Sequence, residues 1–390
     1  MDSARLERIR SLFEVIEKGV YFNHAATSPL PSTAVEAVCE YARRAARDGR
    51  VPWPEAEAVV EKTRLQLAEL LHVAPETVAF TRNTSSGVVI GLSSIDWQEG
   101  DNVVLMKDAF PAVTYPFNFI LPDVEKRWVT SASLAGGPEC VFELVDGNTR
   151  CIALPWVHFL TGSRFDVASI ARFCRERGIF FIVDAIQGIG AVDCDWSAVG
   201  ADFVAGGGPK WLLSPQGTGY LHVRADTLKR LKPTNHGWLS ARWESFNEIS
   251  TPKPLSPEAR RFEEGTKNYL GIFGMHESLK LFLETGMPEV ETRLREITGH
   301  LRNRLEATGW EIVTPAERER SAGTVTCRHA EIDAAGVVEW LADGGMVCAV
   351  RENMLRIAPH FYNTEDEVDR FTQRMSDPKA KTVKPGTCPT

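Results

Sequence analysis

Short apolar runs alternate with amphipathic stretches between about residue 21 and residue 225. The apolar runs have the length of buried strands, and the stretches between them repeat apolar residues at helical spacing. This alternation predicts an α/β fold in which helices cover both faces of a parallel sheet. The strands that we expect are Val78–Thr81, Asn102–Met106, Arg150–Leu154, Ile179–Val183, Phe203–Ala205 and Gly219–Val223.

The stretch FDVASIARFCRERG, residues 165–178, has the pattern of one helix between these strands. We expect Asp166 to cap this helix at its N-terminus and Gly178 to end it. The residues that follow, IFFIVDA, are apolar at successive positions, as in a strand that is buried on both faces. They therefore predict a central strand.

The chain beyond the sheet predicts a smaller unit. Residues 274–308 have a helical pattern, and the short apolar runs EIVTP, GTVTCR and MLRIAPH after them are typical of an α+β domain. Thr364 and Glu367 have the spacing of a capping box that opens a last helix. We therefore predict four parts, which are an N-terminal helical arm (1–20), a large domain (21–273), a small C-terminal domain (274–375) and a flexible tail (376–390).

Composition narrows the class of partner. With 43% hydrophobic and 25% charged residues, the 390-residue chain has the balance of an ordered globular protein. Its formal net charge is −8 and it has no block rich in Lys and Arg, so we expect a small-molecule partner and no nucleic acid.

The same sequence carries no signal for a membrane, a metal or an oxidising compartment. No apolar run approaches the roughly 20 residues of a membrane span, and the first residues are charged throughout, unlike a signal peptide. The eight cysteines are scattered without a CxxC pair or a Cys/His cluster, so neither a zinc site nor a disulfide framework is predicted. We therefore expect a cytoplasmic protein that binds no metal.

Polar residues follow the ends of the predicted strands, which is where open parallel sheets bind ligands. In FTRNTSSG, Thr84 and Ser85 come at the start of a helix, where free N–H groups and the helix dipole suit a phosphate. An ordinary helix cap is the alternative. Asp184 ends the central strand, and a buried carboxylate is costly unless a cation or strong donors meet it. A cap for the next helix is the other interpretation of Asp184.

Lys210 lies in GGGPKWLLSPQGTG, a stretch of glycine, proline and apolar residues. A lysine in such a turn is commonly a solvated surface residue. Here the residues on both sides are apolar, and desolvation lowers the pKa of a lysine toward use as a Schiff-base nucleophile. A phosphate-binding helix start, a carboxylate for a ring nitrogen and a Schiff-base lysine are together what a site for pyridoxal 5'-phosphate (PLP) must supply.

The sequence resembles the class V aminotransferase family of fold-type I PLP-dependent enzymes, which includes cysteine desulfurases, isopenicillin N epimerase-like proteins and C–S lyases. The resemblance covers nearly the whole chain, in the order YFNHAATSPLP, FTRNTSSG, AFPAVTYPF, FIVDAIQGIGAVDCD, GGGPKWLLSPQGTGYLHVR, RFEEGTKN and LRIAPHFYNTEDEVDRF. It implies a large PLP-binding domain with a mainly parallel sheet flanked by helices, and a smaller C-terminal α+β domain.

The resemblance also implies roles for the matched residues. Lys210 would hold PLP as a Schiff base, and Asp184 would pair with the nitrogen of its ring. Gln187 would donate a hydrogen bond to the ring hydroxyl, and Phe110 would stack on the ring face. The phosphate would be held by Thr84 and Ser85 of one subunit and by Thr266 of the other, so that a homodimer completes each site.

For the substrate, the resemblance implies an α-amino acid whose α-carboxylate is clamped by the guanidinium of Arg356. His24 and Trp238 come in stretches that approach the substrate in the family, so they are expected to line its pocket. A packed core position is the alternative for both residues.

Two stretches depart from the family pattern. In GGGPK, Gly207 and Pro209 stand where the family often has a hydroxyl donor and a polar residue, which implies a weaker hold on the phosphate. Desulfurases carry a nucleophilic cysteine in a mobile loop, whereas Cys348 here lies in an apolar run, and Phe159 stands where they place an Asn. Persulfide chemistry is therefore not predicted.

We expect a homodimeric transaminase that acts on an α-amino acid through Schiff-base and quinonoid intermediates, with the released Lys210 removing the α-proton. A C–S lyase that works by β-elimination, or an epimerase, acting on a sulfur-containing amino acid is the alternative because it begins with the same step. A non-catalytic scaffold of the same fold is a further alternative, which only Gly207 and Pro209 support. A nucleotide-binding protein is not predicted, since the GxGxxG and GxxxxGK[ST] patterns are absent.

Overall fold

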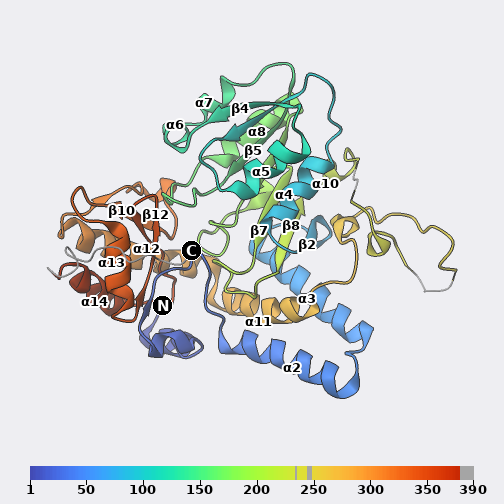
Figure 1. Ribbon diagram of the computed structural model, residues 1–390. Helices are drawn as coiled ribbons and strands as arrows, with labels where there is room; N and C mark the ends of the chain where they lie inside the picture. Colours follow the sequence, from blue (N-terminus) through green and yellow to red (C-terminus); the bar gives the residue numbers. More distant parts are fainter. Residues whose placement is uncertain (233–234, 244–247, 378–390) are drawn as a thin grey trace.

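A seven-stranded sheet forms the centre of the structure, a computed structural model that describes residues 1–232, 235–243 and 248–377 (Figure 1). Strand β8 is antiparallel to both of its neighbours, and the other strand pairs are parallel. The mainly parallel α/β fold is therefore confirmed. In spatial order the strands are β2 (Val78–Thr81), β8 (Gly219–Val223), β7 (Phe203–Gly207), β6 (Phe180–Asp184), β5 (Thr149–Pro155), β3 (Asn102–Met106) and β4 (Glu125–Val129).

All six strands that the sequence predicts are present, with bounds that agree within two residues. The structure adds β4, whose sequence EKRWV is mostly polar. This strand lies at the edge of the sheet and its side chains are partly exposed, so it does not need the apolar pattern that marks a buried strand.

Helices cover both faces of the sheet, because alternate residues of each strand point to opposite sides. One face packs against α4 (Thr84–Ser93) and α5 (Pro111–Ile120). The other packs against α3 (Trp53–Leu71), α8 (Val167–Arg177) and α11 (Tyr269–Thr285), and α2 (Ser32–Asp48) lies along α11 (Figure 1). Shorter helices of this part are α6 (Ser131–Ala135), α7 (Glu139–Phe142), α9 (Trp196–Val199) and α10 (Ala225–Leu228).

The caps of α8 are those that the sequence predicts. The side chain of Asp166 accepts a hydrogen bond from the backbone N–H of Ser169 at 3.0 Å. Gly178 ends the helix with a φ of +70°, a conformation that glycine adopts without steric cost. Local sequence chemistry therefore determines both ends of this helix.

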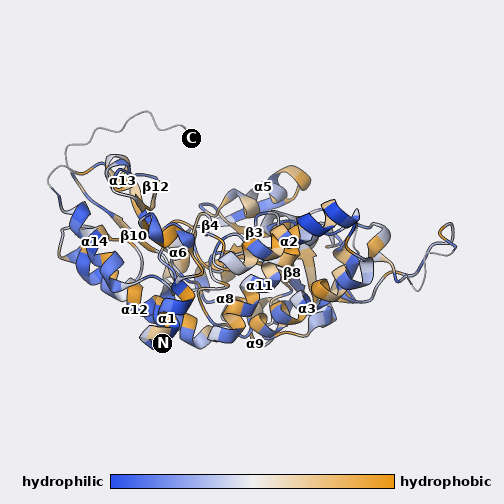
Figure 2. Cartoon of the chain, turned by 90° about the horizontal axis from the view of Figure 1, so that it is seen from below, coloured by the Kyte–Doolittle hydropathy of each residue, from blue (hydrophilic) through white to orange (hydrophobic). Residues whose placement is uncertain are grey.

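A second, antiparallel sheet organises the C-terminal part, in the order β12 (Ala349–Arg351), β13 (Met354–Ile357), β10 (Val325–Arg328) and β9 (Glu311–Ile312). Helices α12 (Met287–Glu306), α13 (Ala334–Ala342) and α14 (Glu365–Met375) pack on it around a separate apolar cluster. The predicted capping box of Thr364 and Glu367 opens α14. Figure 2 shows hydrophilic and hydrophobic residues interleaved along α14, as expected of a helix with one buried face.

The predicted division into four parts stays a prediction. Its boundaries after residues 20 and 273 can be compared with the helices and strands of the structure. The arm 1–20 contains α1 (Ser3–Arg10) and the turn Glu14–Glu17, and β1 (Val20–Tyr21) then pairs with β11 (Met346–Val347). The division at 273 and 274 falls inside α11. Of the tail 376–390, residues 378–390 lie outside the described residues.

The segment with the predicted helical pattern, 274–308, contains the second part of α11 and the whole of α12. Gly286 separates α11 from α12 with a φ of +84°. None of the helices in the described ranges combines the length and the apolar character needed to cross a bilayer.

Candidate active site

Three segments converge at the edge of the main sheet where the parallel strands end. Asp184 is the last residue of β6 and is paired in register with Ala205 of β7, the strand that leads to Lys210. A Cβ atom placed on Gly207 would lie 3.3 Å from the Thr84 hydroxyl oxygen and 3.3 Å from the side chain of Ile186. The start of α4, the end of β6 and the lysine turn therefore meet around a residue without a side chain.

Lys210 is half-buried, and its ammonium nitrogen lies 5.5 Å from the centre of the Phe110 ring. Desolvation lowers the pKa of Lys210 to about 8, with Arg356 and Arg351 adding to the lowering and Asp184 opposing it. An amine with this pKa is half uncharged at about pH 8, where a lysine with the ordinary pKa of 10.5 is almost fully charged, and the uncharged form is the nucleophile.

Asp184 is 4% exposed, and its Oδ1 atom accepts a hydrogen bond from the backbone N–H of Ile186 at 3.0 Å. Burial raises the pKa of Asp184, while the Ile186 N–H and the positive charge of Lys210 act in the opposite direction. Its Oδ2 atom has no hydrogen bond to any residue that the structure describes. A protonated ring nitrogen would satisfy this oxygen and stabilise the buried charge.

The start of α4 offers donors to an anion. The hydroxyl of Thr84 is buried and has no hydrogen-bond partner within the described part of the chain, an arrangement that is costly unless a ligand completes it. Asn83 caps the helix by accepting the N–H of Ser86 at 2.9 Å, and Ser85 is half-buried beside it. The free N–H groups of the first helical turn suit a phosphate here.

The amide of Gln187 is held by two protein groups. Its nitrogen donates to the carbonyl of Ala25 at 3.0 Å, and its oxygen accepts the indole N–H of Trp211 at 2.9 Å.

The Phe110 ring is 48% exposed and stands edge to face with Phe159, with 5.4 Å between ring centres.

Arg356 of β13 brings a buried cation toward the same region. It is 3% exposed, and its Nη1 atom donates to the carbonyl of Phe159 at 3.0 Å, whereas its Nε atom has no partner among the described residues. Burial, with a smaller effect of Arg351, lowers the pKa of Arg356 to about 10. A buried guanidinium that forms no ion pair with any carboxylate of the described chain fits the role of holding a substrate carboxylate.

His24 lies in the interior of the structure. It is fully buried, with Nδ1 2.8 Å from the carbonyl of Ala358 and Nε2 2.8 Å from the hydroxyl of Tyr362. Burial lowers the pKa of His24 to about 3, so its ring is neutral. A substrate contact for His24 stays a prediction, and the geometry favours the alternative of a packed histidine.

Trp238 and Thr266 lie on exposed segments of the chain. Trp238 begins the short helix Trp238–Ser240, is 40% exposed and has its ring 5.8 Å from that of Trp53. Thr266 is exposed in the loop after Phe262. Their predicted roles, with the substrate and with the phosphate of a second subunit, stay predictions.

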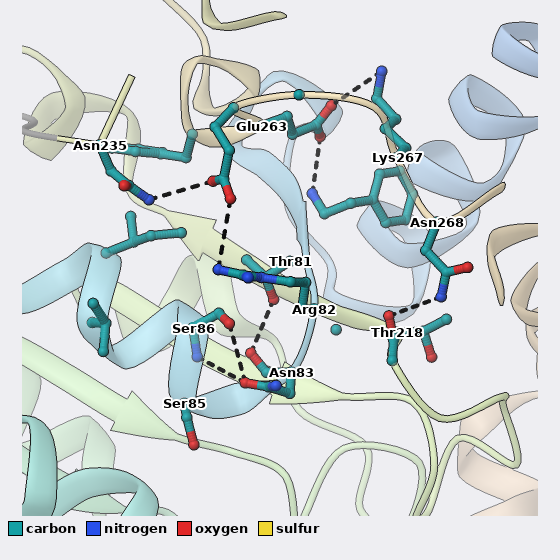
Figure 3. Close-up of a pocket in the computed structure, with 18 of the residues that line it drawn as sticks. Thr81, Arg82, Asn83, Ser85, Ser86, Thr218, Asn235, Glu263, Lys267 and Asn268 are labelled. Carbon is teal, nitrogen blue, oxygen red and sulfur yellow. Dashed lines mark hydrogen bonds and ion pairs between the residues drawn. The ribbon is translucent and has the colours of Figure 1, made fainter. Parts of the chain in front are cut away.

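A cavity of about 480 Å³ adjoins the phosphate end of this site (Figure 3). Ser85 and Ser86 of α4 line one side of it, and Thr266 and Lys267 line the other, but Lys210 and Asp184 do not line it. Sequence reasoning missed the other polar residues of the cavity wall as members of a site, and these are Thr81, Arg82, Asn83, Thr218, Asn235, Glu263, Glu264 and Asn268.

Sequence reasoning also missed the residues that hold the lysine turn. Ser28 donates its N–H to the carbonyl of Pro209 at 2.8 Å and its hydroxyl to the carbonyl of Lys210 at 2.6 Å. His360 lies with Nε2 3.0 Å from the carbonyl of Trp211. No local pattern marks these residues, because each acts on a turn about 150 residues or more away in the sequence.

Comparisons with known proteins agree with this geometry. The profile of the family described as "Aminotransferase class-V" matches residues 20–371. The chain is 29% identical to isopenicillin N epimerase of Streptomyces clavuligerus, over 91% of this chain and 94% of that protein. It is 25% identical to a probable cysteine desulfurase of Methanothermobacter thermautotrophicus, over 96% and 98% of the two chains.

A solved structure of a C-DES mutant with glycine covalently linked to its PLP cofactor has the same fold. The TM-score is 0.88 at 23% sequence identity, and the match covers 94% of this chain and 99% of that one. Together with the family match over most of the sequence, the convergence of Lys210, Asp184 and Thr84 agrees with a PLP site. The chain belongs to the class V aminotransferase family and is a PLP-dependent enzyme.

Proposed function

We propose that this protein is a transaminase that acts on an α-amino acid. The observation that carries the proposal is a half-buried amine with a pKa of about 8, Lys210, whose charge interacts with both the buried carboxylate of Asp184 and the buried guanidinium of Arg356. PLP supplies an aldehyde that this amine can bind and a ring that withdraws electrons from the substrate.

The residues of the site divide between cofactor and substrate. When PLP is bound, the buried Asp184 would hold the protonated ring nitrogen, Gln187 would donate to the ring hydroxyl, and Phe110, close to Lys210, would cover one ring face. Thr84 and Ser85 hold the phosphate, because the Thr84 hydroxyl is otherwise unpartnered and both residues begin α4. Arg356, whose charge interacts with that of Lys210, would bind the α-carboxylate of the substrate and so orient its α-carbon relative to Lys210.

Transamination suits this site because it needs one mobile base. Lys210 would take the proton from the substrate α-carbon, and its ammonium form would give that proton to the carbon that the PLP aldehyde contributes. An epimerase with two bases would need a second proton donor on the opposite side. Phe110, whose ring lies 5.5 Å from the Lys210 nitrogen and contacts Phe159, carries no group that could donate a proton.

Epimerisation is the second candidate, and the likeness to the Streptomyces clavuligerus isopenicillin N epimerase favours it. A single lysine that returns the proton to either side of the α-carbon would be sufficient for that reaction. Persulfide chemistry of the desulfurase type has less support, because burial raises the pKa of the Cys348 thiol to about 12 and keeps it protonated.

The reaction can be identified from its products. Holoenzyme is incubated with a panel of L- and D-amino acids and assayed for pyridoxamine phosphate with a keto acid, for pyruvate with a thiol or sulfide, and for inverted stereochemistry. We expect pyridoxamine phosphate and keto acid, and we expect Lys210→Ala to abolish both. Inversion or thiol release without pyridoxamine phosphate would contradict transamination.

We further propose that the enzyme is a cytoplasmic homodimer. The exposed position of Thr266 supports a contact with a second subunit. The cysteines of the described chain are all unpaired, which is typical of a reducing compartment. Sedimentation of the holoenzyme should give twice the chain mass, and cell fractionation should place the activity in the cytoplasm. A monomer with full PLP affinity would contradict the shared site.

A further inference from the structure

Buried hydrogen bonds link Trp211, the residue that follows Lys210, to Gln187, the residue proposed to contact the cofactor ring. The indole N–H of Trp211 donates to Gln187 Oε1 at 2.9 Å, and Gln187 Nε2 donates to the carbonyl of Ala25 at 3.0 Å. None of the three residues is more than 4% exposed. Water therefore cannot easily replace either bond.

The two partners fix the orientation of the Gln187 amide. An indole nitrogen can only donate a hydrogen bond, and a backbone carbonyl can only accept one. If the amide were flipped, its NH2 group would face the Trp211 N–H, and its oxygen would face the carbonyl of Ala25. Both contacts would then be repulsive and both would be buried. The amide is therefore held with its nitrogen away from Trp211.

We propose that Trp211 is a positioning residue for the cofactor, which acts by holding the Gln187 amide so that one N–H stays free to donate to the ring hydroxyl. An amide nitrogen carries two hydrogens, and Ala25 takes only one of them. This inference rests on the proposed function, in which Gln187 contacts that hydroxyl.

Trp211 is itself immobilised. It is fully buried, and its carbonyl accepts a hydrogen bond from Nε2 of His360 at 3.0 Å. Nδ1 of the same ring accepts the N–H of Phe361 at 2.9 Å, which leaves Nε2 as the donor. A Cβ atom on Gly323 would lie 2.5 Å from the Trp211 ring, which shows that the backbone at Gly323 packs directly against the indole. The indole has no room to turn its N–H away from Gln187.

Absorption spectroscopy of the holoenzyme tests this inference. The absorption band of PLP bound to Lys210 changes with pH, and a donor to the ring oxygen lowers the midpoint because it stabilises the negative oxygen. We expect Trp211→Phe, which removes the indole N–H, to raise the midpoint by about one pH unit, a tenfold change in proton affinity. Gln187→Ala should raise it similarly, and the double variant should match Gln187→Ala alone.

Trp196→Phe is the matched control. Trp196 is 1% exposed and packs edge to face on Trp156, so the change removes a similar buried volume without touching Gln187. We expect it to lower the unfolding temperature and to leave the pH midpoint unchanged. Benzothienylalanine at position 211, which keeps the shape of the indole and lacks its N–H, should reproduce the shift even if Trp211→Phe folds poorly.

The outcomes separate this inference from the proposed function. If both variants at position 211 kept the wild-type pH midpoint of the absorption change while Gln187→Ala shifted it, the role of Trp211 would be wrong. The proposed role of Gln187 would still stand. No shift in Gln187→Ala would overturn the inference and the contact of Gln187 with the ring. Loss of the absorption band in Lys210→Ala but in no other variant would confirm that the band reports the proposed linkage.

Discussion

The chemistry of the site depends first on how far single residues are removed from water. Lys210 and Asp184 are ordinary side chains whose pKa values burial moves in opposite directions, downward for the amine and upward for the carboxyl. Each charge also favours the charged form of the other. The local burial of two residues therefore decides whether the lysine can react near neutral pH.

This predicts a pH dependence for the binding of PLP to the apoenzyme. The neutral amine is the reactive form, and it dominates above its pKa, so the rate should rise with pH around a midpoint of about 8 and then level off. Stopped-flow absorbance measures the rate. Asp184→Asn should move the midpoint to lower pH, because it removes the negative charge that raises the pKa of Lys210. A wild-type midpoint near the ordinary lysine value of 10.5 would contradict the burial argument.

At the scale of helices and strands, the buried ion pair of Arg64 and Glu263 connects helix α3 with strand β2 and with the loop that contains Thr266. Arg64 Nη1 of α3 lies 2.6 Å from Glu263 Oε1 and 2.7 Å from the carbonyl of Val78. The same carboxylate oxygen accepts the N–H of Phe80 at 2.9 Å. The position of this loop is therefore set by a charge pair in the interior.

Breaking this pair should destabilise the fold. Arg64→Met leaves the carboxylate of Glu263 buried without its main cation, and we expect a loss of about 3 kcal/mol in the free energy of unfolding, measured in urea. The exposed pair of Arg43 and Glu36 is the control, and Arg43→Met should change stability little because solvent screens both charges. Replacing Arg64 and Glu263 together by apolar residues should cost less than the sum of the single changes. Equal effects of Arg64→Met and Arg43→Met would contradict the argument.

At the scale of the whole molecule, the first residues of the chain hold the last helix. Phe13 stacks on Tyr362 with 3.9 Å between ring centres, and the Tyr362 hydroxyl lies 2.8 Å from His24. Arg10 donates to both Glu367 of α14 and the carbonyl of Tyr362, with Nη2 of Arg10 3.1 Å from Oε1 of Glu367. The predicted N-terminal arm is therefore packed against the C-terminal part.

Shortening Phe13 tests this connection. Phe13 is 1% exposed, and Phe13→Ala should lower the free energy of unfolding by about 3–5 kcal/mol through lost burial and the cavity it leaves. Phe119→Ala is the control, because Phe119 is 77% exposed and its removal should change stability by less than about 0.5 kcal/mol. Thermal unfolding measures both. A Phe13→Ala protein as stable as the wild type would show that the arm contributes little.

Much of the fold could be predicted because its signals are local. The apolar runs of the six central strands and the caps of α8 and α14 depend on neighbouring residues, and they were predicted at the right places. The edge strand β4 escaped prediction because it is not buried enough to need an apolar pattern. The antiparallel direction of β8 is likewise invisible in its composition, because it depends on the connection from Gly207 to Gly219.

The sequence by itself determined six strands of the main sheet and the caps of two helices, since periodicity and capping are properties of a continuous chain, and its motifs carried the resemblance to the family and the residue types expected in the site. Only the tertiary structure decided which of those residues meet. It places Gln187 between Trp211 and Ala25, which is 162 positions away, and it encloses His24 in the core. Such contacts depend on how whole elements pack, because burial and hydrogen-bond geometry are set jointly by segments that no local pattern connects.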